Sequence, residues 1–326
     1  MQFFNPKLLS IARELGFRKG ERLTRQGEPS RGAFVIQDGE LEAQVALPGG
    51  GTLTVAELRG GDLFGETALV ERGLCMASVV ARTNVTGWFI ERAAFRTLVA
   101  SRDPAALEIQ KGLTRVLSEK LRAANARLRA HRAAEDRPAL PFADATRRKP
   151  QFDWRRFLPV LPFFEGFDRD EMDELVEGCA AFELDRGAAL FLAGEAAQAA
   201  FLVLRGAVEI VLPAGELERR ITIAGPGELV GYLPVLERSA YWASARVREA
   251  ACLLELRAPQ LMRHYEGASG TSVSLQHAVH RSLLQALART NAQLTRLISH
   301  ARLNAAHGAA VDLEQALHGQ IVLSYN

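Results

Sequence analysis

The chain has 326 residues, of which 48% are hydrophobic and 24% are charged, a composition typical of a globular protein with a buried core. Its formal net charge of +2 is too small to indicate, by itself, binding to nucleic acid or to an anionic membrane. The cysteines Cys75, Cys179 and Cys252 lie far apart in the sequence, which excludes a paired zinc-ligand spacing and argues against a disulfide framework. The length suggests two domains.

The N-terminal segment does not have the pattern of a signal peptide, because Lys7, Arg13 and Glu14 interrupt any apolar run. No stretch approaches the roughly 20 consecutive apolar residues that a membrane-spanning helix needs. We therefore expect a cytoplasmic protein without a membrane span.

An internal duplication is the most informative feature of the sequence. Residues 17–45 align with residues 184–212. Glycines occupy equivalent positions in the two segments: Gly20 and Gly187, Gly27 and Gly194, and Gly39 and Gly206. Two copies of one unit account for the two domains that the length suggests.

Each copy has the pattern of an all-β unit. Short apolar or alternating runs are separated by glycine-containing turns, which favours a β-barrel or a jelly roll. The turn signals predict a β-hairpin around Asp38-Gly39 in the first copy and another around Arg205-Gly206 in the second. Further strands are expected in residues 49–58, 78–91, 219–224 and 244–256.

A long amphipathic helix is expected after the strands of each copy. Apolar residues recur at three- and four-residue spacings within 109–128 and 275–297, the pattern of a heptad seam. The seam predicts that the two helices pair, either within one chain as a pseudo-dimer or between chains as a homodimer; the alternative is that each helix lies on its own barrel. The residues expected to pair are Leu117, Leu121, Asn125, Leu128, Leu283, Leu287, Asn291 and Leu294.

These elements define four parts of the chain. The predicted parts are a first domain at 1–134, a linker at 135–151, a second domain at 152–302, and a tail at 303–326 with a short helix and a strand-like end. The prolines of the linker stop any helix, so we expect it to be exposed and its basic run at 147–149 to be solvated. Asp168 or Asp170 is expected to cap a helix at the start of the second domain.

These features resemble the cyclic nucleotide-binding domain family, the sensor fold of catabolite-activator and FNR-type regulators and of protein kinase A regulatory subunits. The resemblance is carried by the spacing of Gly20-Glu21 and Gly27-Glu28, by Gly39, and by the run from Gly61 to Glu66. It covers most of the chain, in two copies. It implies an α+β fold of two β-roll or jelly-roll barrels, each followed by a long amphipathic helix.

The resemblance also implies a ligand site in the first copy. In the family, backbone N–H groups at the start of a short helix bind a phosphate, a glutamate accepts a hydrogen bond from the ribose, and an arginine pairs with the phosphate. Here the arginine position holds Cys75, and Arg72 or Arg82 is the candidate to replace its charge. The ligand-binding candidates are Phe64, Gly65, Glu66, Thr67, Ala68, Arg72, Cys75, Ala77 and Ser78.

The second copy departs further from the family pattern. Gly231 is retained, but Tyr232 stands in place of the glutamate and Tyr241 in place of the arginine. Trp242 follows, where the family has a small residue. We expect these aromatic side chains to fill the second pocket, which would then bind no cyclic nucleotide.

Two functions are consistent with this sequence. The first is a non-enzymatic regulatory or adaptor protein that acts on an unknown protein partner and does not bind cAMP conventionally. The alternative is a receptor that holds a cyclic nucleotide or a cyclic dinucleotide in the first domain and signals by helix rearrangement. No catalytic motif or metal-ligand cluster is recognisable, and His277 and His280 are expected on a polar helix surface. The residues after His300 are too few and not basic enough to predict a DNA-binding helix-turn-helix.

Overall fold

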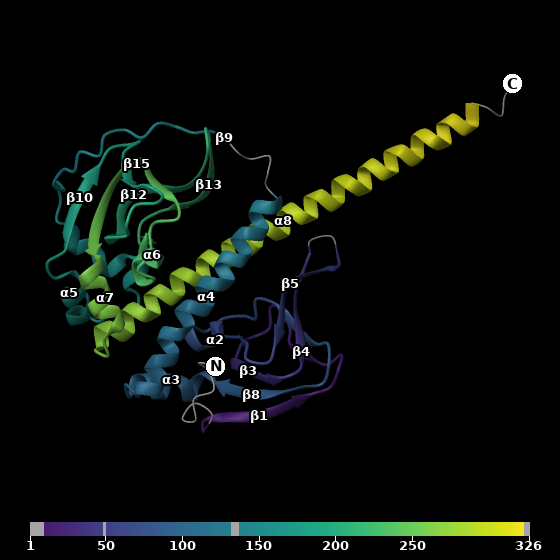
Figure 1. The fold of residues 1–326 in the computed structure, drawn as a ribbon, viewed down its shortest axis with the longest axis horizontal. Coiled ribbons are helices and arrows are strands. Elements are labelled where there is room, and N and C mark those ends of the chain that lie inside the picture. Colours follow the sequence, from purple (N-terminus) through teal and green to yellow (C-terminus); the bar gives the residue numbers. More distant parts are fainter. Residues whose placement is uncertain (1–9, 48–49, 132–136, 323–326) are drawn as a thin grey trace.

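The computed structural model describes residues 10–47, 50–131 and 137–322. It contains two antiparallel β-barrels, one for each repeat, which lie on opposite sides of a pair of long helices (Figure 1). The predicted α+β fold is therefore confirmed. Within the described residues, no helix is both long and apolar enough to cross a membrane.

The first barrel consists of two four-stranded sheets, with the orders β1-β8-β3-β6 and β2-β7-β4-β5. Along β4, apolar side chains that point inward alternate with more exposed ones, as expected for a sheet with one buried face. The strands are β1 (Ala12–Phe17), β2 (Arg22–Thr24), β3 (Gly32–Asp38), β4 (Glu40–Ala46), β5 (Thr52–Arg59), β6 (Leu63–Phe64), β7 (Ser78–Ala81) and β8 (Val85–Glu91).

The predicted hairpin at Asp38-Gly39 is wrong. β3 pairs with β6 and β8 in one sheet, whereas β4 pairs with β5 and β7 in the other, so the chain changes sheets at Gly39. Gly39 has a φ of 99°, and a Cβ there would collide with the carbonyl of Asn84. Glycine thus allows a sharp corner where two strand segments approach each other closely. A turn residue between apolar runs does not distinguish such a corner from a hairpin.

The second barrel is more continuous. β12 runs through Gly206 as one long strand and pairs with β15 on both sides of it, so the hairpin predicted at Arg205-Gly206 is also wrong. Where the first barrel has two separate sheets, the second has one sheet of order β10-β15-β12-β13-β9. β11 pairs with β15 and β14 pairs with β12. The strands are β10 (Ala180–Leu184), β11 (Ala189–Phe191), β12 (Ala199–Ala214), β13 (Leu217–Ala224), β14 (Leu229–Val230) and β15 (Ser244–Arg257).

The helices repeat in the same order after each barrel. The first repeat has α2 (Thr67–Val70), α3 (Arg92–Ala100) and α4 (Pro104–His131), and the second has α6 (Tyr232–Leu236), α7 (Ala258–Glu266) and α8 (Gly270–Val322). The second repeat begins with the 3-10 helices η1 (Trp154–Val160) and η2 (Pro162–Phe164) and with α5 (Arg169–Val176). Asp168 caps α5 in a capping box with Glu171, which confirms the first of the two predicted caps.

The predicted tail is not a separate element. α8 continues without a break to Val322, so residues 303–322 extend this helix beyond the end of α4 (Figure 1). The strand-like end expected for the last residues falls partly on residues 323–326, which lie outside the described residues.

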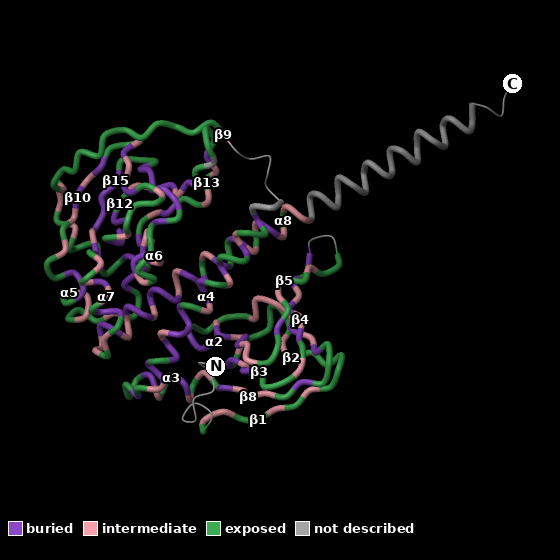
Figure 2. The backbone as a smooth tube through the Cα atoms, viewed as in Figure 1, coloured by how far each residue is buried: buried purple, intermediate pink, exposed green. Residues whose placement is uncertain are grey.

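The two long helices pair within the chain. The six leucines of the predicted seam are buried, with exposed fractions of 9% or less. Thr290 Oγ1 donates to Asn125 Oδ1 at 3.2 Å, so one of the two predicted asparagines takes part in the contact between the helices. Figure 2 shows buried residues along α4 and the first part of α8, where the helices lie together. The intramolecular pseudo-dimer, one of the two predicted pairings, is therefore present.

Thr114 and His280 lie near the approximate two-fold axis of this pseudo-dimer. They are equivalent residues of the two repeats, 166 positions apart, and His280 Nε2 lies 2.9 Å from Thr114 Oγ1. Equivalent residues touch each other only close to a two-fold axis. The hydroxyl of Tyr265 also bonds to Thr114, and Gln110 Nε2 donates to the Val273 carbonyl at 3.3 Å. The expected surface position of His280 is thus wrong, since its exposed fraction is 1%.

Acid should weaken the folded pseudo-dimer. Burial, together with the nearby His277, lowers the pKa of His280 from 6.5 to about 3. The unfolded chain binds a proton near pH 6.5 and the folded chain does not, so this contribution to stability is complete above pH 6.5 and is lost as the pH falls towards 3. His280 alone should reduce the free energy of unfolding by about 3 kcal/mol at pH 4.5 relative to neutral pH.

Urea denaturation at pH 7.5 and 4.5 measures this effect. We expect a His280→Gln variant to lose less stability between the two pH values than the wild-type chain, because glutamine does not titrate. An equal pH-dependent loss in both proteins would contradict the assignment to His280.

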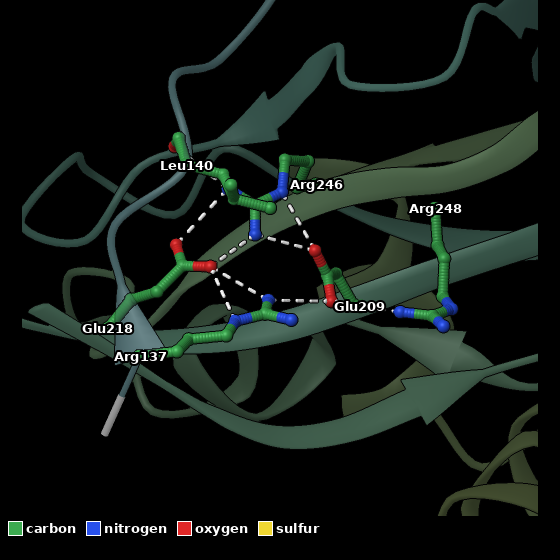
Figure 3. A network of polar contacts seen from close by, with 6 residues as sticks. All are labelled: Arg137, Leu140, Glu209, Glu218, Arg246 and Arg248. Carbon is green, nitrogen blue, oxygen red and sulfur yellow. Dashed lines mark hydrogen bonds and ion pairs between the residues drawn. The ribbon is translucent and has the colours of Figure 1, made fainter. Parts of the chain in front are cut away.

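The segment predicted to be an exposed linker is bound to the second barrel through a buried ionic cluster (Figure 3). Arg246 of β15 is 3% exposed and contacts Glu209 at 2.6 Å and Glu218 at 2.5 Å. Arg137, from the linker, reaches the same two carboxylates at 3.0 and 2.7 Å. Burial by itself raises the pKa of Glu209, but hydrogen bonds from Arg246 and Arg137 outweigh it and lower the pKa. The two arginines therefore favour the charged form of Glu209.

Backbone contacts fix the same segment. β9 (Arg137–Pro138) pairs with β13, and Arg246 Nη1 donates to the Leu140 carbonyl at 2.9 Å. The basic run is also in contact with the barrel: the guanidinium of Arg147 lies 4.1 Å from the ring centroid of Phe182, and Arg148 pairs with Asp185. Residues 138–149 are exposed, as predicted for the linker, but these contacts attach the segment to the second barrel.

Candidate functional site

A cavity of about 190 Å³ lies between the first barrel and the two long helices. Six of the nine predicted ligand-binding residues line it: Phe64, Gly65, Glu66, Thr67, Cys75 and Ala77. The wall also includes Lys120 and Arg127 of α4 and Leu287, Asn291 and Leu294 of α8. The sequence therefore located the barrel side of the cavity, and the helices of both repeats cover it.

The other three predicted residues do not line the cavity. Ala68 is buried in α2 with an exposed fraction of 1%, and Arg72 is exposed to solvent. Ser78 Oγ accepts a hydrogen bond from the backbone N–H of Gln26 at 3.0 Å. Arg82, the second candidate to replace the missing charge, pairs with Glu42 at 3.8 Å and Glu57 at 3.4 Å. Neither predicted replacement arginine therefore contributes to the cavity.

The backbone at Gly65 positions the acidic residue of the site. Gly65 has a φ of 73°, and a Cβ there would lie 2.8 Å from the carbonyl of Gly32. Glycine thus allows the turn between β6 and α2 to pack directly on β3. The next residue, Glu66, is the N-cap of α2 and is buried, with an exposed fraction of 4%.

Lys120 supplies the positive charge next to Glu66. Its Nζ lies 2.8 Å from Glu66 Oε1 and also donates to the Leu63 carbonyl at 3.2 Å. No sequence pattern indicated this contact, because Lys120 is one of several charged residues on α4. Its position beside the cavity depends on how α4 packs on the barrel.

The second carboxylate oxygen of the same glutamate is unusual. Glu66 Oε2 is buried and has no hydrogen-bond partner among the described residues. A buried acceptor without a donor costs about 1–3 kcal/mol. The first cavity therefore contains an acceptor that a donor group of a ligand could satisfy.

The size of the cavity limits what it holds in this arrangement. Small-molecule sites commonly have volumes of about 300–1,000 Å³, and the first cavity measures about 190 Å³. The guanidinium of Arg127 at its edge is bonded to the Val55 carbonyl. Binding of a nucleotide would therefore require α4 or α8 to move away from the barrel.

The second barrel has a corresponding cavity of about 180 Å³. Tyr241, at the arginine position, is 5% exposed, stacks on Phe191 with ring centroids 3.8 Å apart, and donates its hydroxyl to the Ala199 carbonyl at 2.5 Å. Trp242 is 46% exposed. The expectation that these aromatic residues fill the pocket is wrong, because Tyr241 forms a wall and a cavity remains beside it.

The helices line the two cavities in a reciprocal manner. Asn291 of α8 lines the cavity of the first barrel, and its equivalent Asn125 of α4 lines the cavity of the second. Each cavity is thus bounded by residues of both repeats.

Comparison with known proteins identifies the same two repeats that the internal duplication of the sequence indicates. The family model described as "Cyclic nucleotide-binding domain" matches residues 14–102 and 181–266. The cGMP-dependent protein kinase egl-4 of Caenorhabditis briggsae is 33% identical over 92 residues, which cover 28% of this chain and 12% of the relative. The cAMP-dependent protein kinase regulatory subunit of Dictyostelium discoideum is 31% identical over 86 residues, 26% of each protein. The chain thus spans only 12% and 26% of the length of these two curated relatives.

Two solved structures are also similar to the chain. The regulatory subunit of a cAMP-independent protein kinase A from Trypanosoma brucei is 18% identical, with a TM-score of 0.34, over 93% of this chain and 90% of that one. A putative cyclic nucleotide-binding protein from Geobacter metallireducens is 19% identical, with a TM-score of 0.37, over 42% of this chain and 99% of that one. Because the family model matches more than half of the residues, in two tandem regions, this chain belongs to the cyclic nucleotide-binding domain family.

Proposed function

We propose that this chain is a non-enzymatic regulatory protein that acts through a protein partner and does not bind cAMP in the conventional way. The observation that carries the proposal is the contact between Glu66 and Lys120 at 2.8 Å. It joins the wall of the first cavity to α4, next to Leu121, which packs in the core shared with α8. The state of the cavity is thereby coupled to the docking of the two repeats.

The coupling has a simple physical form. A nucleotide that enters the first cavity must displace side chains of α4 and α8, because both helices line it and its volume is only about 190 Å³. Displacement shifts the population between docked and undocked arrangements of the repeats, and a partner that prefers one arrangement would respond. We propose a protein rather than DNA as that partner, because α8 is one continuous helix from Gly270 to Val322 rather than a helix-turn-helix. The proposal includes a cytoplasmic location.

The residues at the arginine positions support the loss of conventional cAMP binding. Cys75 and Tyr241 cannot pair with a cyclic phosphate as a guanidinium does. Losing one partner of a buried charge pair costs about 2–5 kcal/mol, which corresponds to an affinity lower by roughly 30-fold to several thousand-fold. A micromolar site would become close to millimolar.

One observation favours a second candidate function, a receptor with its ligand in the first domain. Glu66 Oε2 is buried without a donor, and a ligand hydroxyl or amino group would satisfy it. In that case a cyclic nucleotide or a cyclic dinucleotide would enter when the helices move.

Thermal unfolding of the full chain with cAMP, cGMP or a cyclic dinucleotide, each at about 1 mM, distinguishes the two functions. A ligand at 100 times its dissociation constant adds about 2.7 kcal/mol to stability, which raises the midpoint by several degrees. The regulatory proposal expects no shift with any of the three.

A variant pair identifies the site if a shift occurs. A shift that disappears in Glu66→Gln but persists in Glu71→Gln, an exposed glutamate at the other end of α2, would establish the receptor and overturn the ligand-independent proposal.

A further inference from the structure

We propose that the cavity of the second repeat is a binding site for a small, uncharged aromatic molecule of one or two rings. The proposal concerns a different cavity from the one that contains Glu66, so it does not depend on the proposed function. It follows from the size, the walls and the charge of this cavity.

Aromatic and aliphatic side chains make up most of the walls. Four aromatic residues line the cavity: Phe191, Tyr232, Tyr241 and Trp242. Ile210, Leu229 and Val230 add aliphatic surface. Aromatic walls attract aromatic ligands through stacked and edge-to-face contacts in addition to the burial of apolar area.

Part of the aromatic wall, formed by Tyr241 and Phe191, is held in place before any ligand binds. Tyr241 is fixed at its ring by stacking on Phe191 and at its hydroxyl by the hydrogen bond to the Ala199 carbonyl. A Cβ on Gly231 would lie 3.0 Å from the Tyr241 ring and 3.1 Å from the Phe191 ring, so the two rings fit closely against the backbone. A preorganised wall reduces the entropy that binding must overcome.

The charge of the cavity excludes an anionic ligand. Of the described residues that line it, only Glu228 and Arg289 are charged, and they form an ion pair with each other. Glu228 also accepts a hydrogen bond from the backbone N–H of Gly225 at 2.7 Å. A cyclic phosphate would therefore be buried against aromatic rings without a cation of its own, which is strongly unfavourable.

The volume sets the size of the ligand. The cavity measures about 180 Å³. In another protein, an apolar cavity of about 150 Å³ binds benzene. The space is therefore suited to a molecule between benzene and a fused bicyclic ring, while Ser282, Gln285 and Thr290 of α8 offer polar groups for one ring substituent.

Fluorine NMR of 5-fluoroindole with the full chain tests the proposal directly. We expect saturable broadening of the fluorine signal, and no saturable effect on 4-fluorobenzoate, which carries a negative charge. Absence of saturable binding of 5-fluoroindole up to about 5 mM would overturn the proposal, since even weak sites of this size bind in the millimolar range.

Two matched variants, each with an alanine replaced by phenylalanine, locate the site. Ala286→Phe on α8 fills the second cavity and should weaken binding of 5-fluoroindole by at least about tenfold. Ala123→Phe, the same change on α4 at the first cavity, should leave binding unchanged. Ile210→Phe fills the second cavity from β12 and replaces Ala286→Phe if that variant does not fold. Unchanged binding in a folded cavity-filling variant, or equal losses in the variants of both cavities, would contradict the assignment.

Discussion

Replacing Arg246 with alanine should lower the free energy of unfolding by about 3–5 kcal/mol, because it leaves buried carboxylates without their main partner. Glu209 and Glu218 are each 3% exposed, and Arg246 contacts both. Arg137 is the other cation close to both carboxylates and is itself partly exposed. Urea denaturation of the wild-type chain and the variant, followed by circular dichroism, measures the difference.

Arg248 provides a matched control for this prediction. It lies on the same strand and 3.7 Å from the same Glu209, but its side chain is 43% exposed. Arg248→Ala should change stability by less than about 1 kcal/mol, since solvent screens an exposed pair. Limited trypsin digestion gives a second measurement: Arg246→Ala should accelerate cleavage in residues 137–148, because the cluster holds this segment on the barrel. Equal losses of stability in the two variants would contradict the claim that Arg246 contributes more than Arg248 because it is buried.

Replacing Leu283 with alanine should lower the free energy of unfolding by about 2–5 kcal/mol, the range for deleting a buried leucine side chain. Leu283 is 0% exposed and belongs to the core that α4 and α8 share. Removing its side chain therefore leaves a cavity inside this core. The same denaturation experiment measures the loss.

The control for this second prediction is Leu74→Ala. Leu74 is 59% exposed, so the same chemical change should alter stability by no more than about 0.5 kcal/mol. A small effect of Leu283→Ala, comparable to that of Leu74→Ala, would show that the pairing of α4 and α8 contributes little to the folded state.

Local patterns predicted the secondary structure well and the connections less well. Alternation and glycine spacing located β5, β7, β8, β13 and β15, and the heptad spacing located the paired faces of α4 and α8. The same patterns failed at Gly39 and Gly206, because a glycine that turns a strand into another sheet looks like a glycine in a hairpin. Which strands pair depends on residues distant in the sequence.

Only part of the candidate site could be predicted, because its other residues are also distant in the sequence. Residues 64–77 are contiguous, so their resemblance to a known segment identified one wall of the first cavity. The candidates for a replacement cation, Arg72 and Arg82, lie near Cys75 in the sequence, whereas Lys120 reaches Glu66 from a different element. His280 was similarly assigned to a polar surface, although the two-fold packing of the helices buries it against Thr114.

The sequence by itself determined that this protein is a tandem of two β-barrels with long amphipathic helices and that both phosphate-binding arginines are missing, because these properties depend on residue identity and on short-range periodicity. The tertiary structure decided which charged groups face each cavity, that the helices pair within the chain, and that the linker is held by Arg246, Glu209 and Glu218. The physical reason is that burial and ion pairing arise between residues separated by tens to more than a hundred positions, and their proximity exists only once the two repeats have folded and docked.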